Sequence, residues 1–128
     1  MMFDIANIKP EEWDHDIHVF VCAHFCVHSD DLFEALRKTK CFIIHFGAER
    51  GYTSAQCSRK YHETITCFWV ERIWNIISKN NIQNFSDFEV YFQTHRSLFE
   101  KTEIDSVYSP ESLRSFKAKA KWVEPDIQ

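Results

Sequence analysis

The chain has 128 residues, a length that allows one compact domain with its own core and leaves no room for two. Hydrophobic residues make up 45% of it and charged residues 27%, a composition that is typical of globular proteins and excludes a disordered chain. The net charge of −4 disfavours a dedicated nucleic-acid-binding protein, which needs basic side chains to neutralise phosphates. We therefore expect a single domain over residues 1–128, with its core at about 10–122.

The chain contains only 2 glycines and 3 prolines, too few for the many tight turns of a β-sandwich or barrel. The composition therefore predicts an all-α fold: a helical bundle of four main helices, followed by short C-terminal helices and an extended tail. The 12 phenylalanines and 4 tryptophans exceed what a core of this size normally holds, so some of these rings are candidates for an interaction surface.

Several features of the sequence bear on the cellular compartment. The first residues, from Met1 to Asp4, lack the basic and apolar regions of a secretion signal. The longest apolar stretch, residues 19–27, has nine residues, whereas a membrane-spanning helix needs about 20. The 5 cysteines form an odd set without CxxC spacing, which favours reduced thiols over a disulfide framework. These features predict a cytoplasmic protein that does not bind a membrane.

The first helix is expected over residues 10–28, because Pro10 suits the first helical position and two glutamates follow it. Residues 19–27 are apolar on nearly every side, which indicates a helix buried on several faces; a buried β-strand is the alternative for this stretch. The Ser-Asp-Asp sequence at 29–31 is a helix start signal. Apolar residues at three- and four-residue steps after it predict a second helix that ends near Gly47.

The longest helix is expected over residues 54–79, where an Asn-Asn pair follows its last turn. A shorter helix, rich in aromatic residues, begins after Asn84. The Ser-Pro pair at 109–110 is typical of a helix start, and another short helix is expected over 116–121. Beyond it, Pro125 predicts an extended tail.

His62 is the most informative polar residue of the chain. At about 100° of rotation per residue, it falls on the face of the 54–79 helix that carries a row of apolar side chains, so it should point into the core. A buried imidazole without a partner costs about 1–3 kcal/mol. We therefore expect His62 either to ligate a metal or to form a hydrogen bond, for example with the hydroxyl of Thr66.

His15 and His18 lie three residues apart and share one face of the first helix. Two imidazoles one turn apart can bind one transition metal, and His62 from another helix would add a third ligand and leave one coordination position open. Such pairs also arise by chance in a chain with 7 histidines, and His24 with His28 forms a second same-face pair.

Three roles are open to Glu63, at the edge of the same apolar stripe: metal ligand, general base for a bound water, or ion partner of Arg59. Glu12 and His15 match the spacing of carboxylate-bridged di-iron bundles, but residues 59–62 do not supply the second copy that those bundles need. The chain also lacks a glycine-rich phosphate loop and the GxSxG motif of serine hydrolases.

Four short motifs follow one another along the chain. They are His-Asp-Ile-His at 15–18, Lys-Tyr-His-Glu-Thr-Ile-Thr at 60–66, Tyr-Ser-Pro-Glu-Ser-Leu-Arg-Ser at 108–115 and Val-Glu-Pro-Asp at 123–126. With these motifs the chain resembles a bacterial family of small proteins of unknown function, over about residues 10–126, and the 60–66 motif is the most specific part. Lys117 and Lys119 depart from the family, in which acidic or arginine residues are more usual at these positions.

The resemblance implies a selection among the histidines, because it favours His15, His18 and His62 over the other four. It also implies a set of neighbours that orient these imidazoles or a bound ligand. That set consists of Lys60, Tyr61, Thr64, Thr66 and Tyr108.

The leading hypothesis from the sequence is a metal-binding protein in which His15, His18 and His62 hold one divalent zinc, iron or manganese ion. Glu63 would be a further ligand, or the base that activates water for hydrolysis of a small molecule at the open position. The sequence does not decide whether the protein is an enzyme.

The alternative hypothesis is a non-enzymatic interaction or structural module whose buried histidines only fix helix packing. In that case some of the tryptophans would form the surface of a homodimer. The four tryptophans of the chain are Trp13, Trp69, Trp74 and Trp122. A third possibility is a pocket between helices that binds an organic ligand without a metal.

Overall fold

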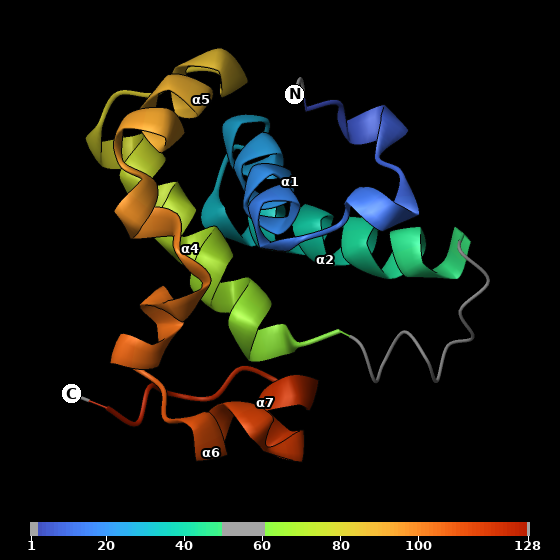
Figure 1. The fold of residues 1–128 in the computed structure, drawn as a ribbon, viewed down its shortest axis with the longest axis vertical. Coiled ribbons are helices and arrows are strands. Elements are labelled where there is room, and N and C mark those ends of the chain that lie inside the picture. Colours follow the sequence, from blue (N-terminus) through green and yellow to red (C-terminus); the bar gives the residue numbers. More distant parts are fainter. Residues whose placement is uncertain (1–2, 50–60, 128) are drawn as a thin grey trace.

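The structure is a computed structural model that describes residues 3–49 and 61–127, and these residues form helices and connecting segments without a strand (Figure 1). The all-α prediction is therefore confirmed, and the alternative of a buried strand at residues 19–27 is wrong. The longer helices are α1 (His15–Val27), α2 (Leu32–Glu49), α4 (Glu63–Lys79) and α5 (Phe85–Thr94). The shorter ones are η1 (Ile5–Asn7), η2 (Pro10–Glu12), η3 (Arg96–Phe99), η4 (Lys101–Ser106), α6 (Pro110–Arg114) and α7 (Phe116–Ala120).

The first predicted helix is divided into two pieces. Pro10 starts the short 3₁₀ helix η2 as expected, but α1 begins only at His15, because the Asp14 carboxylate accepts a hydrogen bond of 2.9 Å from the backbone N–H of Ile17 and caps a new helix. Trp13 lies in the break between the two pieces. The start of α2 is as predicted, since Asp31 accepts a hydrogen bond of 2.8 Å from the N–H of Glu34.

Helix α4 begins later than the sequence predicts. His62 is its N-cap, with an extended backbone, so Tyr61 and His62 precede the helix instead of lying within it. The earlier part of the predicted helix, residues 54–60, lies outside the described residues. The end is as predicted: α4 stops at Lys79, and Asn81 adopts a positive φ of 55°, a conformation that asparagine tolerates after a helix.

Helix α1 lies at the centre of the packing, in contact with α2, α4 and α5. This position explains why residues 19–27 are apolar on nearly every side. Aromatic rings fill the space between α1 and α5, and Phe88 and Phe92 are at most 1% exposed. The ring centroids of Phe20 and Phe92 lie 4.8 Å apart, and those of Phe88 and Phe99 lie 5.5 Å apart. Much of the unusual aromatic content is therefore core.

The C-terminal segment returns to the start of α4, so that α7 packs against α4 and α6 packs against α7 (Figure 1). The Thr64 hydroxyl lies 2.6 Å from the carbonyl oxygen of Ala118, to which it donates. After α7 the chain is extended, as predicted, and the Tyr108 hydroxyl donates a hydrogen bond of 2.6 Å to the carbonyl of Val123. No helix in the described part of the chain is both long and apolar enough to cross a membrane.

Candidate functional site

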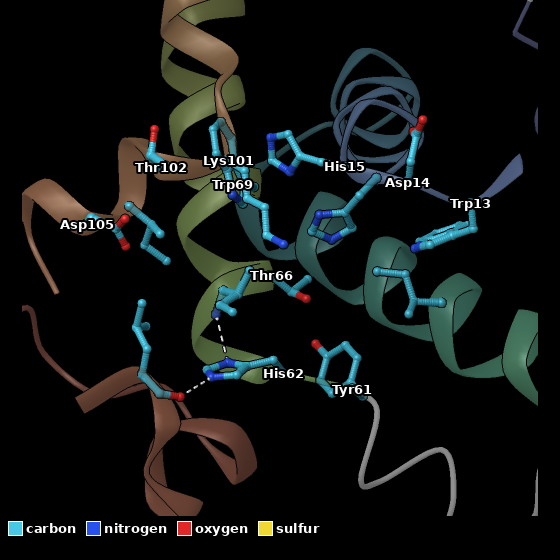
Figure 2. Close-up of a pocket in the computed structure, with 15 residues that line it drawn as sticks. Trp13, Asp14, His15, Tyr61, His62, Thr66, Trp69, Lys101, Thr102 and Asp105 are labelled. Carbon is cyan, nitrogen blue, oxygen red and sulfur yellow. Dashed lines mark hydrogen bonds between the residues drawn. The ribbon is translucent and has the colours of Figure 1, made fainter. Parts of the chain in front are cut away.

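A pocket with a volume of about 620 Å³ lies between the start of α1, the middle of α2, the first half of α4 and the segment from η4 to α6 (Figure 2). Its lining includes all three histidines that the sequence selects. The full lining consists of Trp13, Asp14, His15, His18, Ile43, Tyr61, His62, Ile65, Thr66, Trp69, Lys101, Thr102, Ile104, Asp105 and Leu113. His15, His18 and His62 therefore line one pocket, and their role as a shared site stays a prediction.

His15 is held by two contacts. Its Nε2 lies 2.7 Å from the carbonyl oxygen of Phe99, and its ring meets Trp69 edge-on at a centroid distance of 4.9 Å. Because a carbonyl can only accept a hydrogen bond, Nε2 carries the hydrogen and donates it. In the neutral ring Nδ1 is then the nitrogen with the lone pair.

His18 is the histidine whose protonation the fold changes most. Burial first, and then the nearby charge of His15, lowers the pKa of His18 to about 4. Its ring also lies beside that of Trp13, at a centroid distance of 6.2 Å. His18 therefore lines the pocket as a neutral imidazole at physiological pH.

His62 has a hydrogen bond at each ring nitrogen. Nδ1 accepts the backbone N–H of Ile65 at 3.1 Å, and Nε2 lies 2.7 Å from the carbonyl oxygen of Leu113, to which it donates (Figure 2). The alternative of a hydrogen-bonded histidine is thus the one that fits, but the partners are backbone groups and not the Thr66 hydroxyl. With its lone pair given to an N–H and its other nitrogen protonated, the ring offers no lone pair to a metal in this arrangement.

Within residues 3–49 and 61–127, no group of three or more His, Cys, Asp or Glu side chains is arranged to hold a metal ion. The site predicted from His15, His18 and His62, with zinc, iron or manganese, stays a prediction.

Glu63 does not line the pocket, and other side chains surround its carboxylate. Oε1 accepts the Tyr61 hydroxyl at 2.8 Å and lies 3.1 Å from the Lys40 amine, while the Cys67 thiol lies 3.7 Å from Oε2. The ion partner of Glu63 is therefore Lys40; Arg59, which the sequence offered for this role, lies outside the described residues. Burial first, and then the Glu63 charge, raises the pKa of Cys67 to about 12.

The neighbours implied by the resemblance divide into two groups. Tyr61 and Thr66 line the pocket, whereas Thr64 and Tyr108 bind the C-terminal segment through their hydroxyls. Lys60 lies outside the described residues. Residues of the motifs at 60–66, 108–115 and 123–126 meet in this way around the start of α4, and we call these contacts the C-terminal clamp.

The clamp has further contacts at the other end of the tail. The Asp126 carboxylate accepts hydrogen bonds from the Ser109 hydroxyl at 2.6 Å and from its backbone N–H at 2.8 Å. These bonds lower the pKa of Asp126. Together with the bond from His62 to Leu113, they place the α6 segment against the pocket, so the clamp builds one of its walls.

The pocket also contains residues that sequence analysis did not select. Lys101 and Asp105 stand on η4 as exposed charges, and Figure 2 shows the Lys101 side chain extending toward the histidines. Trp13 reaches the pocket from the break before α1. No local pattern marks Lys101 or Asp105, because η4 lies more than eighty positions along the chain from His15 and only tertiary packing joins them.

Comparisons of the chain with protein-family models, with curated proteins and with solved structures find no match. The resemblance to a bacterial family of small proteins therefore stays a prediction.

Proposed function

We propose that the pocket binds a small organic molecule directly, without a metal ion. The observation that carries the proposal is the state of the histidines: they line one cavity of about 620 Å³, yet His62 uses both of its ring nitrogens in hydrogen bonds to the backbone. A volume of this size is typical of pockets for small organic ligands.

The chemistry of the lining favours an uncharged ligand with a ring. Burial that keeps His18 neutral would also disfavour a charged group of a ligand at the same depth. Trp13 and Trp69 supply flat apolar surfaces, and Nδ1 of His15 can accept a hydrogen bond. The charges of Lys101 and Asp105 are exposed, so a charged substituent would lie at the pocket mouth.

Binding without catalysis fits the placement of Glu63, the one base that the sequence proposed. Its carboxylate accepts hydrogen bonds outside the pocket lining, next to Lys40. The metal-dependent alternative would require His62 to give up one of its two backbone hydrogen bonds, at a cost of about 1–3 kcal/mol if the group is left unsatisfied.

The proposal is tested by ligand-observed NMR with a library of uncharged heteroaromatic fragments, in the presence of a chelator. We expect fragments that bind the wild-type protein with the chelator present and bind the His18→Leu variant at least about tenfold more weakly, because leucine cannot form a hydrogen bond with the ligand. His45→Gln is the matched control, since His45 is exposed on α2 and pairs with Glu49 at 3.1 Å.

Two results would contradict the proposal. One is that no fragment of the library binds the wild-type protein. The other is binding that disappears with the chelator while elemental analysis finds about one equivalent of metal per chain, which would favour the metal centre predicted from the sequence.

Three finer expectations also belong to this proposal: a bundle arrangement of α1, α2, α4 and α5, a cytoplasmic location and a homodimer. The contacts of α1 with the other three helices support the first. For a homodimer, Trp122 is 47% exposed, but Trp69 is 1% exposed and belongs to the core. Sedimentation equilibrium tests the homodimer.

A further inference from the structure

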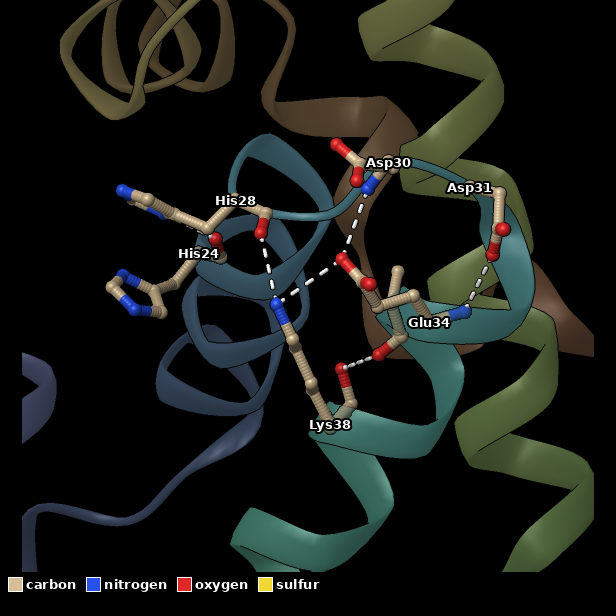
Figure 3. A network of polar contacts seen from close by, with 8 residues as sticks. His24, His28, Asp30, Asp31, Glu34 and Lys38 are labelled. Carbon is tan, nitrogen blue, oxygen red and sulfur yellow. Dashed lines mark hydrogen bonds and ion pairs between the residues drawn. The ribbon is translucent and has the colours of Figure 1, made fainter.

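A second pair of histidines lies on α1, away from the pocket. His24 and His28 stand at the C-terminal end of the helix, and His24 is nine residues beyond His15, about 13 Å along the helix axis. Figure 3 shows both imidazoles projecting from the same side of α1 toward solvent. His28 is exposed, whereas His24 is half-buried.

The two rings have a separation that suits binding of one metal ion. Their centroids lie 4.5 Å apart, with 35° between the ring planes. A metal lies about 2.0–2.1 Å from a coordinating imidazole nitrogen, and thus about 3.2 Å from the ring centroid. Two such rings at adjacent positions of a square, about 90° apart, have centroids separated by about 4.5 Å; at the tetrahedral angle the separation is about 5.2 Å. The observed separation leaves room for the square arrangement.

The hydrogen bond of His28 leaves the lone pair of its other ring nitrogen available to a metal. Nδ1 lies 2.8 Å from the carbonyl oxygen of His24, so it donates its hydrogen there. The lone pair of the neutral ring is then on Nε2. Histidines that ligate metals commonly donate their other ring hydrogen to a carbonyl in this way, which fixes the tautomer and the ring orientation.

One positive charge, that of Lys38, lies near the two histidines. Burial first, and then the charges of His28 and Lys38, lowers the pKa of His24. The positive charge of Lys38 is partly offset, because its amine lies 3.2 Å from the Glu34 carboxylate and donates to the carbonyl of His28 at 3.0 Å (Figure 3).

We propose that His24 and His28 form a surface site for one divalent transition-metal ion and that copper(II) binds there most tightly. Two imidazoles at adjacent positions suit the tetragonal geometry of copper(II), and the general order of stability places copper above nickel and zinc. Water completes the coordination, so the bound ion is exchangeable. This site is separate from the pocket and does not depend on the function proposed for it.

The test is a titration of the untagged, metal-free protein with copper(II), followed by calorimetry and by electron paramagnetic resonance. We expect one copper ion per chain at this site and hyperfine coupling to two nitrogens. In His28→Ala the affinity should fall by at least about tenfold, since even loss of an outer hydrogen bond costs a metal site about 10–100-fold. Nickel and zinc should bind more weakly than copper.

Two control variants locate the metal. His45→Ala removes an exposed histidine of α2 whose neighbour one turn away is Glu49, and His18→Gln alters the pocket. Neither should change the titration. Copper affinity that is unchanged in His28→Ala, or that falls equally in His18→Gln, would overturn the proposal. Because His28 is exposed, its variant should fold even where a change at half-buried His24 does not.

Discussion

The C-terminal clamp can be tested by the substitution Thr64→Val, which removes a hydroxyl and keeps the shape of the side chain. Thr64 is completely buried at the start of α4. Its oxygen lies 2.6 Å from the carbonyl oxygen of Ala118 and 3.0 Å from that of Lys121, and it accepts the N–H of Val123 at 3.3 Å. One hydroxyl thus joins α4 to three backbone groups of the C-terminal segment.

The expected loss follows from these contacts. A hydroxyl has a single hydrogen, so the bond to Ala118 counts as the main donated bond, with a net contribution of about 0.5–1.5 kcal/mol. Valine also leaves partly buried backbone groups without a hydrogen-bond partner, which costs about 1–3 kcal/mol of stability if water does not reach them. Since the exposed tail can take up water, we expect a total loss of about 2 kcal/mol, which lowers Tm by about 6–8 °C for a chain of this length.

Urea unfolding measures the free-energy change, and limited trypsin digestion reports whether the tail is released at the lysines of α7. Thr94→Val is the matched control, because the Thr94 hydroxyl is exposed and bonds only to carbonyls of its own helix, α5, and to His95. The control should lose less than about 0.5 kcal/mol. Equal stability and equal tail digestion in the two variants would refute the clamp.

Two further predictions concern stability. His18 has a pKa of about 4 in the folded protein, so the unfolded chain binds a proton at a higher pH than the folded chain does. The free energy of unfolding should therefore fall by up to about 3 kcal/mol between pH 6.5 and pH 4. The His18→Gln variant should show a flatter pH profile in this range when unfolding is measured with urea. In urea titrations, Phe88→Ala should cost about 3–5 kcal/mol, since Phe88 is 0% exposed, whereas Phe33→Ala, at a position 84% exposed, should change stability by less than about 0.5 kcal/mol. Equal effects of the two phenylalanine substitutions would contradict the assignment of the core.

The parts of the fold that the sequence predicted are those governed by neighbouring residues. The Ser-Asp-Asp start of α2, the Asn-Asn end of α4 and the Ser-Pro start of α6 all depend on side chains within a few positions of the helix end. Apolar residues on nearly every side of 19–27 likewise predicted a helix buried on several faces. These predictions hold because the relevant hydrogen bonds are local.

The predictions from the sequence were wrong where two local signals compete or where segments distant in the sequence meet. Pro10 and Asp14 both favour a helix start, and the chain uses both, which divides the first helix. His62 was expected inside a helix, but its imidazole caps α4 by accepting the N–H of Ile65 and donates to the carbonyl of Leu113. The second bond joins residues 51 positions apart, and no sequence periodicity can reveal it.

For the histidines of the candidate site, the sequence could likewise predict which residues lie close together but not their hydrogen-bond partners. Spacing on a helix could place His15 beside His18, and the resemblance could add His62, but neither could show which nitrogens already have partners. That information requires the carbonyls of Phe99 and Leu113, which come from distant segments. The difference matters because a lone pair that accepts a backbone N–H cannot also bind a metal.

The most direct test of a metal-free pocket is nitrogen-15 NMR of the imidazole rings, recorded with a chelator and again with added zinc. We expect His62 to keep a protonated Nε2 and an unprotonated Nδ1 in both samples, and His18 to stay neutral well below pH 6. A change in the His62 ring signals when zinc is added, with loss of its Nε2 hydrogen, would contradict a metal-free pocket and favour the metal centre predicted from the sequence.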